Sequence, residues 1–325
     1  MEKTNKSKFS LGAFRQLSLL LVLAVMVILF SLMSPFFMQR NNILNIMRQV
    51  STNAVCAVAM TMIIIMGEID LSVGSMLAFL SVIGAMTFNA LPDGTPPFLK
   101  SAITLLAAMT TGAVISGLGG LLTATAKIPA FVTTLALMEG IRGLAFIITN
   151  GSPVPISSPV FKVFGSGWVL NLLPVPVVIM LIIILLGVFL MKYTRFGRYI
   201  YSIGGSIQAS KWSGIKTSKI KTLVFVLSGA LYGLAAMIMA GRLGGGYPAT
   251  ASGAEMNAIA ATILGGTSLS GGKGNIWGTI IGVFIIGVIN TGLTLLDVSV
   301  YWQQVLSGVI ILVAVMIDTK NKAKA

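Results

Sequence analysis

PVPVVIMLIIILLGVFLM (residues 174–191), followed at once by KYTRFGRYIYSIGGSIQASKWSGIKTSKIK (192–221), decides the fold of this chain. The first segment is apolar and falls within the range of about 17–25 residues that a helix uses to cross a bilayer. The second segment carries seven basic residues and no acidic one. Because Lys and Arg next to membrane helices stay in the cytoplasm, we expect a membrane span that ends in a cytoplasmic loop.

Apolar stretches of this kind recur along the whole chain. Of its 325 residues, 56% are hydrophobic and 9% are charged, whereas a soluble domain carries roughly 25% charged residues. Two further segments, 129–149 and 253–265, are less apolar and more broken. We predict an all-α polytopic membrane protein with about ten transmembrane segments, some of them broken or re-entrant. The eight clearest spans are 17–37, 48–66, 71–90, 98–124, 174–191, 220–240, 276–296 and 299–317.

The distribution of basic residues predicts the orientation. With a cytoplasmic N-terminus and alternating spans, 16 of the 22 Lys and Arg residues fall inside, five fall outside, and Arg142 lies within the membrane. We therefore expect a cytoplasmic tail over 1–16, a membrane domain over 17–318 that contains the loop 192–221, and a second cytoplasmic tail over 319–325. Loop topology also explains the net charge of +14, so lipid, and no nucleic acid, is the expected surrounding.

The sequence predicts no catalytic residue, no metal site and no cofactor in this chain. It has no histidine, and its one cysteine, Cys56, excludes an internal disulfide and a cysteine-based metal cluster. The glycine-rich run 265–274 departs from a phosphate-binding loop, because Thr267 replaces its first glycine and Gly274 replaces its last Ser or Thr. We therefore expect that ATP is not hydrolysed here.

Within the central loop, residues 204–215 are expected to form a short helix. Ile207, Lys211 and Ile215 are four residues apart, and glycines stand at both ends. A helix of about two turns is marginal on its own, so it needs something to dock on. A partner protein and the membrane surface are both open as its docking site.

Charges inside the membrane each require an explanation. Glu68 and Asp70 lie at a junction of two helices, and Asp70 fits the cap of the next helix better than a transport role. Glu139 and Arg142 share a helical face, so they could pair, line a pathway, or do both.

Two amides and two long loops are further candidates. Asn257 and Asn290 could hydrogen-bond a hydroxylated solute or hold helices together. The loops 150–173 and 241–253 are rich in Gly, Pro and Ser, and they are either a docking surface or plain connections.

The sequence also contains a weak internal repeat, in which Gly67 corresponds to Gly265. Internal repeats are typical of transporters, although chance similarity remains an alternative.

The chain resembles the permeases of bacterial ABC importers for ribose and related monosaccharides, over about residues 35–320. The resemblance rests on the central loop, with Ala209 and Gly214-Ile215, and on further stretches at 67–74, 142–143, 149–153, 258–261 and 264–274. One departure is Gln208, which stands where the family usually has Glu.

This resemblance implies a non-catalytic subunit of the bacterial cytoplasmic (inner) membrane, with both termini in the cytoplasm. It implies three protein partners: a cytoplasmic ATP-binding subunit, an extracytoplasmic sugar-binding protein, and a second permease copy in a homodimer or a heterodimer with a paralogue. The residues implied to contact the ATP-binding subunit are Gly204, Gly205, Gln208, Ala209, Ser210, Gly214 and Ile215.

Three rival functions remain open at this point. The same fold could import a nucleoside, a branched-chain amino acid or a sugar-like signal. A proton-coupled secondary transporter would use Glu68, Asp70 or Glu139 as its proton site, but the central loop argues against it. A scaffold without transport would not need the paired broken segments.

Overall fold

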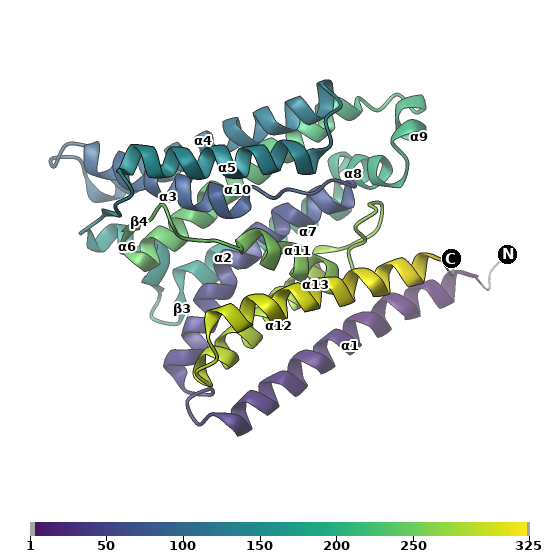
Figure 1. Ribbon diagram of the computed structural model, residues 1–325, viewed down its shortest axis with the longest axis horizontal. Coiled ribbons are helices and arrows are strands. Elements are labelled where there is room, and N and C mark those ends of the chain that lie inside the picture. Colours follow the sequence, from purple (N-terminus) through teal and green to yellow (C-terminus); the bar gives the residue numbers. More distant parts are fainter. Residues whose placement is uncertain (1–3, 324–325) are drawn as a thin grey trace.

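The computed structural model describes residues 4–323, and helices dominate it (Figure 1). Four strands of two residues each accompany the helices: β1 (Val154–Pro155), β2 (Trp168–Val169), β3 (Leu173–Pro174) and β4 (Gly245–Gly246). The helices are α1 (Thr4–Met33), α2 (Arg40–Ile65), α3 (Val73–Ala90), α4 (Pro97–Thr125), α5 (Ala130–Thr149), α6 (Pro159–Ser166), α7 (Val175–Tyr193), α8 (Arg195–Gly205), α9 (Ile207–Trp212), α10 (Thr217–Leu243), α11 (Ala254–Leu264), α12 (Ile276–Leu295) and α13 (Val300–Ala323).

Eight of the helices in the described part of the chain are long and apolar enough to cross a membrane, and α11 and the apolar part of α13 are shorter. The all-α prediction for a polytopic membrane protein is confirmed. Several details differ from the sequence-based prediction. Helix α1 ends at Met33, four residues before the predicted end, and α10 extends three residues beyond each predicted end. Helix α5 is one continuous helix and is not broken, and α2 begins at Arg40, eight residues before the predicted start at Arg48. The first turns of α2 contain polar residues, so hydropathy places the beginning of this helix too late.

Helices α2, α3 and α10 form the core of the bundle. Most residues of their membrane-length segments are buried, including Cys56 in α2, which is 2% exposed. By contrast, the apolar part of α1, Gln16–Met33, contains no buried residue, although α1 packs along α12. Because lipid tails are as apolar as leucine, such exposed faces are stable in a bilayer.

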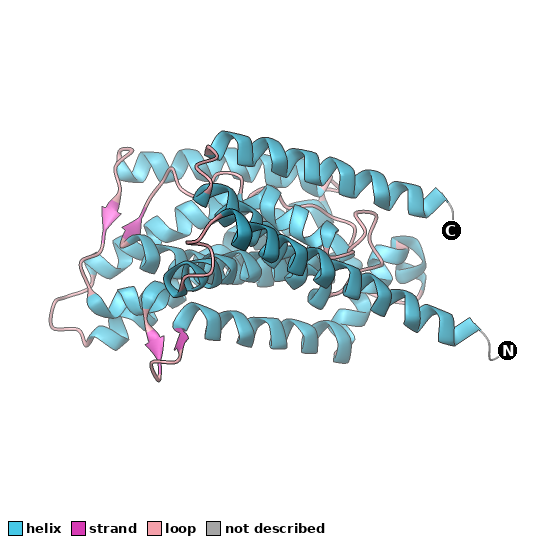
Figure 2. Cartoon of the chain, turned by 90° about the horizontal axis from the view of Figure 1, so that it is seen from below, coloured by secondary structure: helices cyan, strands magenta, loops and turns pink. Residues whose placement is uncertain are grey.

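The two ends of the bundle differ in character. The ends of the described chain and helix α9 lie toward one end, while α6 and the strands lie toward the other (Figures 1 and 2). Six membrane-length helices, α1 to α5 and α7, precede the loop that holds α9, and an even number of crossings returns the chain to the end where α1 begins. The ends of the described chain and the loop 192–221 therefore lie toward the same end of the bundle, and the cytoplasmic location of this end stays a prediction.

At the opposite end, the two long loops pair with one another. Strands β1 and β4 are antiparallel, with Val154 opposite Gly246, and they join loop 150–173 to loop 241–253. Within the first loop, α6 is an additional helix, and β2 and β3 form a small hairpin. These elements are too short to produce a periodic sequence signal, so the sequence predicts loops here.

Candidate functional site

Helices α8 and α9 form the exposed end of the central loop. The Thr194 hydroxyl caps α8 by accepting from the backbone N–H of Gly197 at 3.2 Å, and the Ser206 hydroxyl caps α9 by accepting from that of Ala209 at 3.2 Å. Each cap satisfies a backbone N–H that has no partner inside its helix. The short predicted helix is therefore correct in kind but begins later, because Gly204 and Gly205 belong to the end of α8.

Helix α9 has one inward and one outward face. Ser210 is buried, and its hydroxyl contacts the hydroxyl of Ser202 at 2.8 Å and the carbonyl of Ser206 at 2.9 Å. Gln208, Ala209 and Lys211 are exposed. So are two large apolar side chains, Ile207 at 41% and Trp212 at 80%. An exposed patch that mixes apolar and polar groups suits contact with another protein.

The remaining coupling candidates lie at the helix ends. Gly205 is exposed after the last turn of α8, and Gly214 is exposed after α9. Ile215 is half-buried, and its N–H donates to the carbonyl of Ser210 at 3.0 Å. Of the predicted coupling residues, Gln208, Ala209, Gly205 and Gly214 are therefore accessible to a partner, whereas Ser210 supports α9 from behind.

The two repeated segments form the same kind of turn. Helix α2 ends with the N–H of Gly67 donating to Ile64 and that of Glu68 donating to Ile63. Helix α11 ends with the same two bonds, made by Gly266 and Thr267. Both are Schellman motifs, which require a left-handed residue, and Gly67 (φ 84°) and Gly266 (φ 96°) supply it. The structural repeat thus pairs Gly67 with Gly266, one residue from the alignment made on sequence.

The two turns lie side by side and meet the end of α8. The N–H of Gly272 donates to the carbonyl of Ile65 at 2.8 Å. Gly204 lies so close that a Cβ atom there would sit 1.8 Å from the Ile65 carbonyl oxygen and 2.5 Å from the Gly272 nitrogen. Gly204 therefore packs closely against both turns while staying partly exposed, and its contact with a partner stays a prediction. This glycine joins α8 to both turns.

Tyr201 makes a second contact between α8 and the second repeat. Its hydroxyl donates to the carbonyl of Gly274 at 2.8 Å. Burial raises the pKa of the Tyr201 phenol above its ordinary value, so the group stays protonated and keeps donating at neutral pH. Tyr201 thereby ties α8 to the second repeat.

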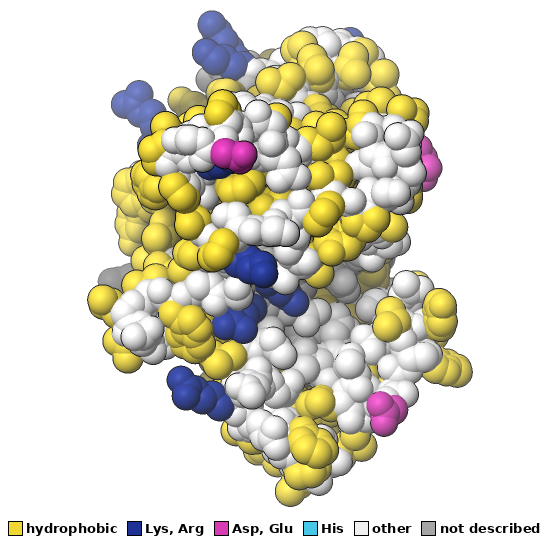
Figure 3. Space-filling model, turned by 90° about the vertical axis from the view of Figure 1, so that its left-hand side faces the viewer, with side chains coloured by type: hydrophobic (Ala, Val, Ile, Leu, Met, Phe, Trp, Pro, Cys, Tyr) yellow, Lys and Arg dark blue, Asp and Glu magenta, His cyan; other side chains and the backbone are white. Residues whose placement is uncertain are grey.

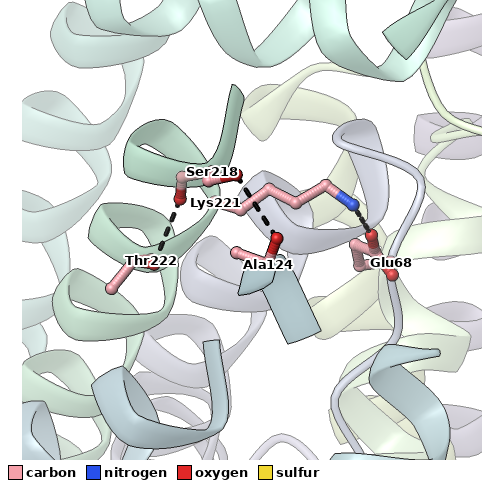
Figure 4. Close-up of polar contacts among 5 residues, drawn as sticks. All are labelled: Glu68, Ala124, Ser218, Lys221 and Thr222. Atoms are coloured by element: carbon pink, nitrogen blue, oxygen red, sulfur yellow. Dashed lines mark hydrogen bonds and ion pairs between the residues drawn. The ribbon is translucent and has the colours of Figure 1, made fainter. Parts of the chain in front are cut away.

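Glu68 forms an ion pair with Lys221, which lies in the first turns of α10 (Figure 4). The two side chains are 15% and 13% exposed, so little solvent screens the pair. Beside it, the Ser218 hydroxyl donates to the carbonyl of Ala124 at 3.3 Å. Glu68 is thus engaged in holding α10 against the first turn, and sequence reasoning missed its partner because 153 residues separate the two.

Asp70 is fully buried and serves the beginning of α3. Its carboxylate accepts from the backbone N–H of Ser72 at 2.8 Å, from the hydroxyl of Ser72 at 2.6 Å and from the hydroxyl of Tyr232 at 3.1 Å. The capping interpretation holds in kind, although Ser72 occupies the N-cap position itself. These hydrogen bonds tie the segment between α2 and α3 to Tyr232 of α10.

Glu139 and Arg142 do not form the predicted pair among the described residues, whose ion pairs are Lys100–Asp93 and Lys221–Glu68. Glu139 is exposed on α5. The Arg142 guanidinium instead donates to the carbonyls of Pro248 at 2.8 Å and Thr250 at 2.7 Å. Arg142 therefore anchors the loop between α10 and α11, a role that spacing along one helix cannot predict.

A cavity of about 940 Å³ contains both predicted amides. Asn257 comes from α11 and Asn290 from α12, and amides of α2 and α13 complete the polar lining. Sequence reasoning missed the α2 amides, although their spacing of three and four residues places them on one helical face.

Among the polar lining residues of this cavity are Asn42, Asn45, Gln49, Asn257, Asn290 and Gln303. Arg242 and Glu255 are the charged residues that line it. Amides both donate and accept hydrogen bonds, which suits a neutral hydroxylated solute.

Basic residues gather at the end of the bundle where this cavity lies. Arg40 and Arg48 both stack near the Trp168 ring, at 6.0 and 5.7 Å from its centroid. In the view onto this end, Lys and Arg side chains cluster near the middle of the face (Figure 3). The long loop 150–173 therefore does more than connect helices, since Trp168 holds the basic start of α2.

Comparison with known proteins gives a consistent result. A family described as "Branched-chain amino acid transport system / permease component" matches residues 42–315. The Ribose import permease protein RbsC of Haemophilus influenzae is 40% identical over 324 residues, covering 98% of each chain. RbsC of Escherichia coli K12 is 42% identical over 311 residues, covering 93% of each. The Xylose transport system permease protein XylH of H. influenzae is 32% identical over 370 residues, covering 94% of this chain and 96% of its own. No solved structure matches.

Proposed function

The chain belongs to the branched-chain amino acid transport system / permease component family, and from this premise we propose that it is the membrane subunit of an ATP-driven importer for a ribose-like monosaccharide. Under this proposal the subunit is non-catalytic and uses no cofactor of its own. It spans the bacterial cytoplasmic membrane over residues 17–318, with the tails 1–16 and 319–325 in the cytoplasm. Residues 1–3 and 324–325 of those tails lie outside the described part of the chain.

The observation that carries the proposal is the exposed helix α9 and its connection to the core. A partner that holds α9 also holds α8, and α8 reaches both repeated turns through Gly204 and Tyr201. We therefore propose that a cytoplasmic ATP-binding subunit docks on Gln208, Ala209 and the exposed Trp212. ATP binding would then move α8 and α9 together, and the turns would pass this movement to α2 and α11.

The amide-lined cavity is the proposed solute pathway on the outer side. Its volume of about 940 Å³ is ample for a monosaccharide, and its lining is rich in groups that hydrogen-bond hydroxyls. The relatives named as ribose permeases, at 40–42% identity over nearly the whole chain, support a ribose-like solute. The outer basic cluster with Arg40 and Arg48 is the proposed docking area for an extracytoplasmic sugar-binding protein. A second copy of this chain, or a paralogue, would complete the pathway.

Reconstitution tests the energy source directly. In proteoliposomes that hold the chain, its ATP-binding subunit and its binding protein, we expect ribose uptake only when ATP is present. A helix-breaking and charge-reversing variant, Ala209→Pro with Lys211→Glu, should leave ATP hydrolysis running while uptake falls to background. Ala209 lies in the first turn of α9, where proline removes the N–H that the Ser206 hydroxyl caps, and the loss of a cap, about 1 kcal/mol, is large for a helix of six residues.

The matched control changes the same surface without breaking the helix. Gln208→Glu restores the residue that the wider family carries and should preserve uptake. The proposal fails if a proton gradient alone drives uptake without ATP, or if the α9 variant transports normally.

The cavity gives a second prediction. Asn257→Leu and Asn290→Leu keep the side-chain size but remove the amide, so ribose uptake should fall roughly five-fold for each, the effect of about 1 kcal/mol per lost hydrogen bond. Thr110→Val is the control, because the Thr110 hydroxyl bonds to its own helix and lies outside the cavity. Initial uptake rates at low ribose concentration measure the effect. Unchanged rates in both Asn variants would exclude this cavity from the pathway.

A further inference from the structure

A second cavity, of about 340 Å³, lies between the end of α7, helix α8 and the start of α12. It is separate from the proposed solute pathway, and it shares Tyr201 with the junction between α8 and the second turn. Its polar side is made by Lys192, Arg198, Tyr201 and Asn275. Its other side is apolar, so the cavity has two chemically distinct halves.

The polar half is positively charged and has no internal counter-ion. Both Lys192 and Arg198 are exposed, and none of the residues that line the cavity is acidic. Neither cation takes part in an ion pair within the described residues. Two cations and an amide that line one cavity are suited to an oxyanion, since Arg and Lys donate charge-assisted hydrogen bonds to phosphate oxygens.

The position of the cavity matches the surface of the bilayer. Lys192 is the next-to-last residue of the span Val175–Tyr193, and Ile276 is the first residue of the span Ile276–Leu295. The headgroup layer lies where spans end, and Trp is enriched there. Trp277 lines the cavity and is 50% exposed.

The apolar half continues toward the hydrocarbon layer. Val188, Met191 and Ile276 line it. The outward face of α7 beside it is open and apolar, with Leu185 60% and Phe189 59% exposed. A ligand that fits both halves must carry an anionic group and a hydrocarbon chain, with the anion at the level of Lys192.

We propose that this cavity binds an anionic phospholipid of the cytoplasmic leaflet, such as phosphatidylglycerol. Its phosphate lies between Lys192 and Arg198, and the first methylenes of a chain lie against Val188 and Met191. Trp277 packs at the headgroup boundary. Because Arg198 is on α8, the helix that carries Gly204, the bound lipid holds α8 at the membrane surface.

The test uses the full chain purified in detergent. Binding is measured by native mass spectrometry during titration with phosphatidylglycerol, with phosphatidylcholine of the same chains, and with inorganic phosphate. The double variant Lys192→Gln with Arg198→Gln removes both cations. The control, Lys216→Gln with Lys219→Gln, removes the same charge from exposed positions of the loop outside the cavity. Unchanged elution volume and thermal unfolding show that each variant is folded.

We expect the native chain to bind phosphatidylglycerol at least about ten-fold more tightly than phosphatidylcholine, and the Lys192/Arg198 variant to lose at least about ten-fold in that affinity. The Lys216/Lys219 control should stay within about two-fold of the native chain. Equal affinity for the two lipids, or an equal loss in the control, overturns the proposal. Displacement of phosphatidylglycerol by millimolar inorganic phosphate also overturns it, since the site would then hold a free anion.

Discussion

Gly204→Ala should abolish ATP-driven ribose uptake. The added Cβ would sit 1.8 Å from the Ile65 carbonyl oxygen and 2.5 Å from the Gly272 nitrogen, and both contacts are with backbone. Backbone cannot turn aside as a flexible side chain can, so α8 must move away from both turns. The hydrogen bond from Gly272 to Ile65 and the contact from Tyr201 to Gly274 lie at the same junction and would be lost with it.

A glycine away from the α8–α9 surface provides a matched control. A Cβ atom at Gly140, in α5, would meet nothing within 4 Å, so Gly140→Ala should transport at a rate close to that of the native protein. The measurement is ATP-dependent uptake in proteoliposomes, with membrane insertion checked for each variant. Normal uptake by Gly204→Ala would show that the junction between α8 and the turns does not carry the coupling.

Lys221→Met should lower the free energy of unfolding by about 3–5 kcal/mol, the loss typical of removing one partner from a buried ion pair. The Glu68 carboxylate is 15% exposed, so the variant leaves a poorly hydrated charge without a counter-ion. Lys219→Met is the control, because Lys219 lies in the same helix and is exposed. Its effect should stay within about 0.5 kcal/mol.

The double variant Glu68→Met with Lys221→Met separates pairing from burial. Removing both charges leaves no unpaired group, so we expect it to recover most of the stability that Lys221→Met loses. Unfolding in mixed micelles gives the four free energies of the cycle. If the two single effects simply add in the double variant, Glu68 and Lys221 do not stabilise each other.

The fold could be predicted from the sequence because hydropathy and length decide where a chain crosses a membrane. Helices α4, α7 and α12 lie within about two residues of the predicted spans. The beginning of α2 was predicted eight residues late because its first turns are polar. Asn42 and Asn45 line a cavity, and Arg40 lies near the Trp168 ring. Hydropathy cannot distinguish a polar turn from a polar helical face inside a protein.

The candidate site was predictable only where its partners are close in sequence. Asp70 and Ser72 are two residues apart, and the capping interpretation was correct in kind. Arg142 bonds to carbonyls more than 100 residues away, and Lys221 finds Glu68 at a separation of 153. Such partners follow from packing, and neither spacing nor composition contains that information.

The burial of Cys56 makes this chain a convenient host for spectroscopic labels. A thiol must be accessible as a thiolate to react with a maleimide or a nitroxide reagent, and the single native thiol is packed in the centre of the helix bundle. A cysteine introduced at the exposed Lys211 would therefore be modified alone, without first removing the native one. Paired with a second introduced site near Asn45, it would report the distance between the two faces of the membrane at each stage of a transport cycle.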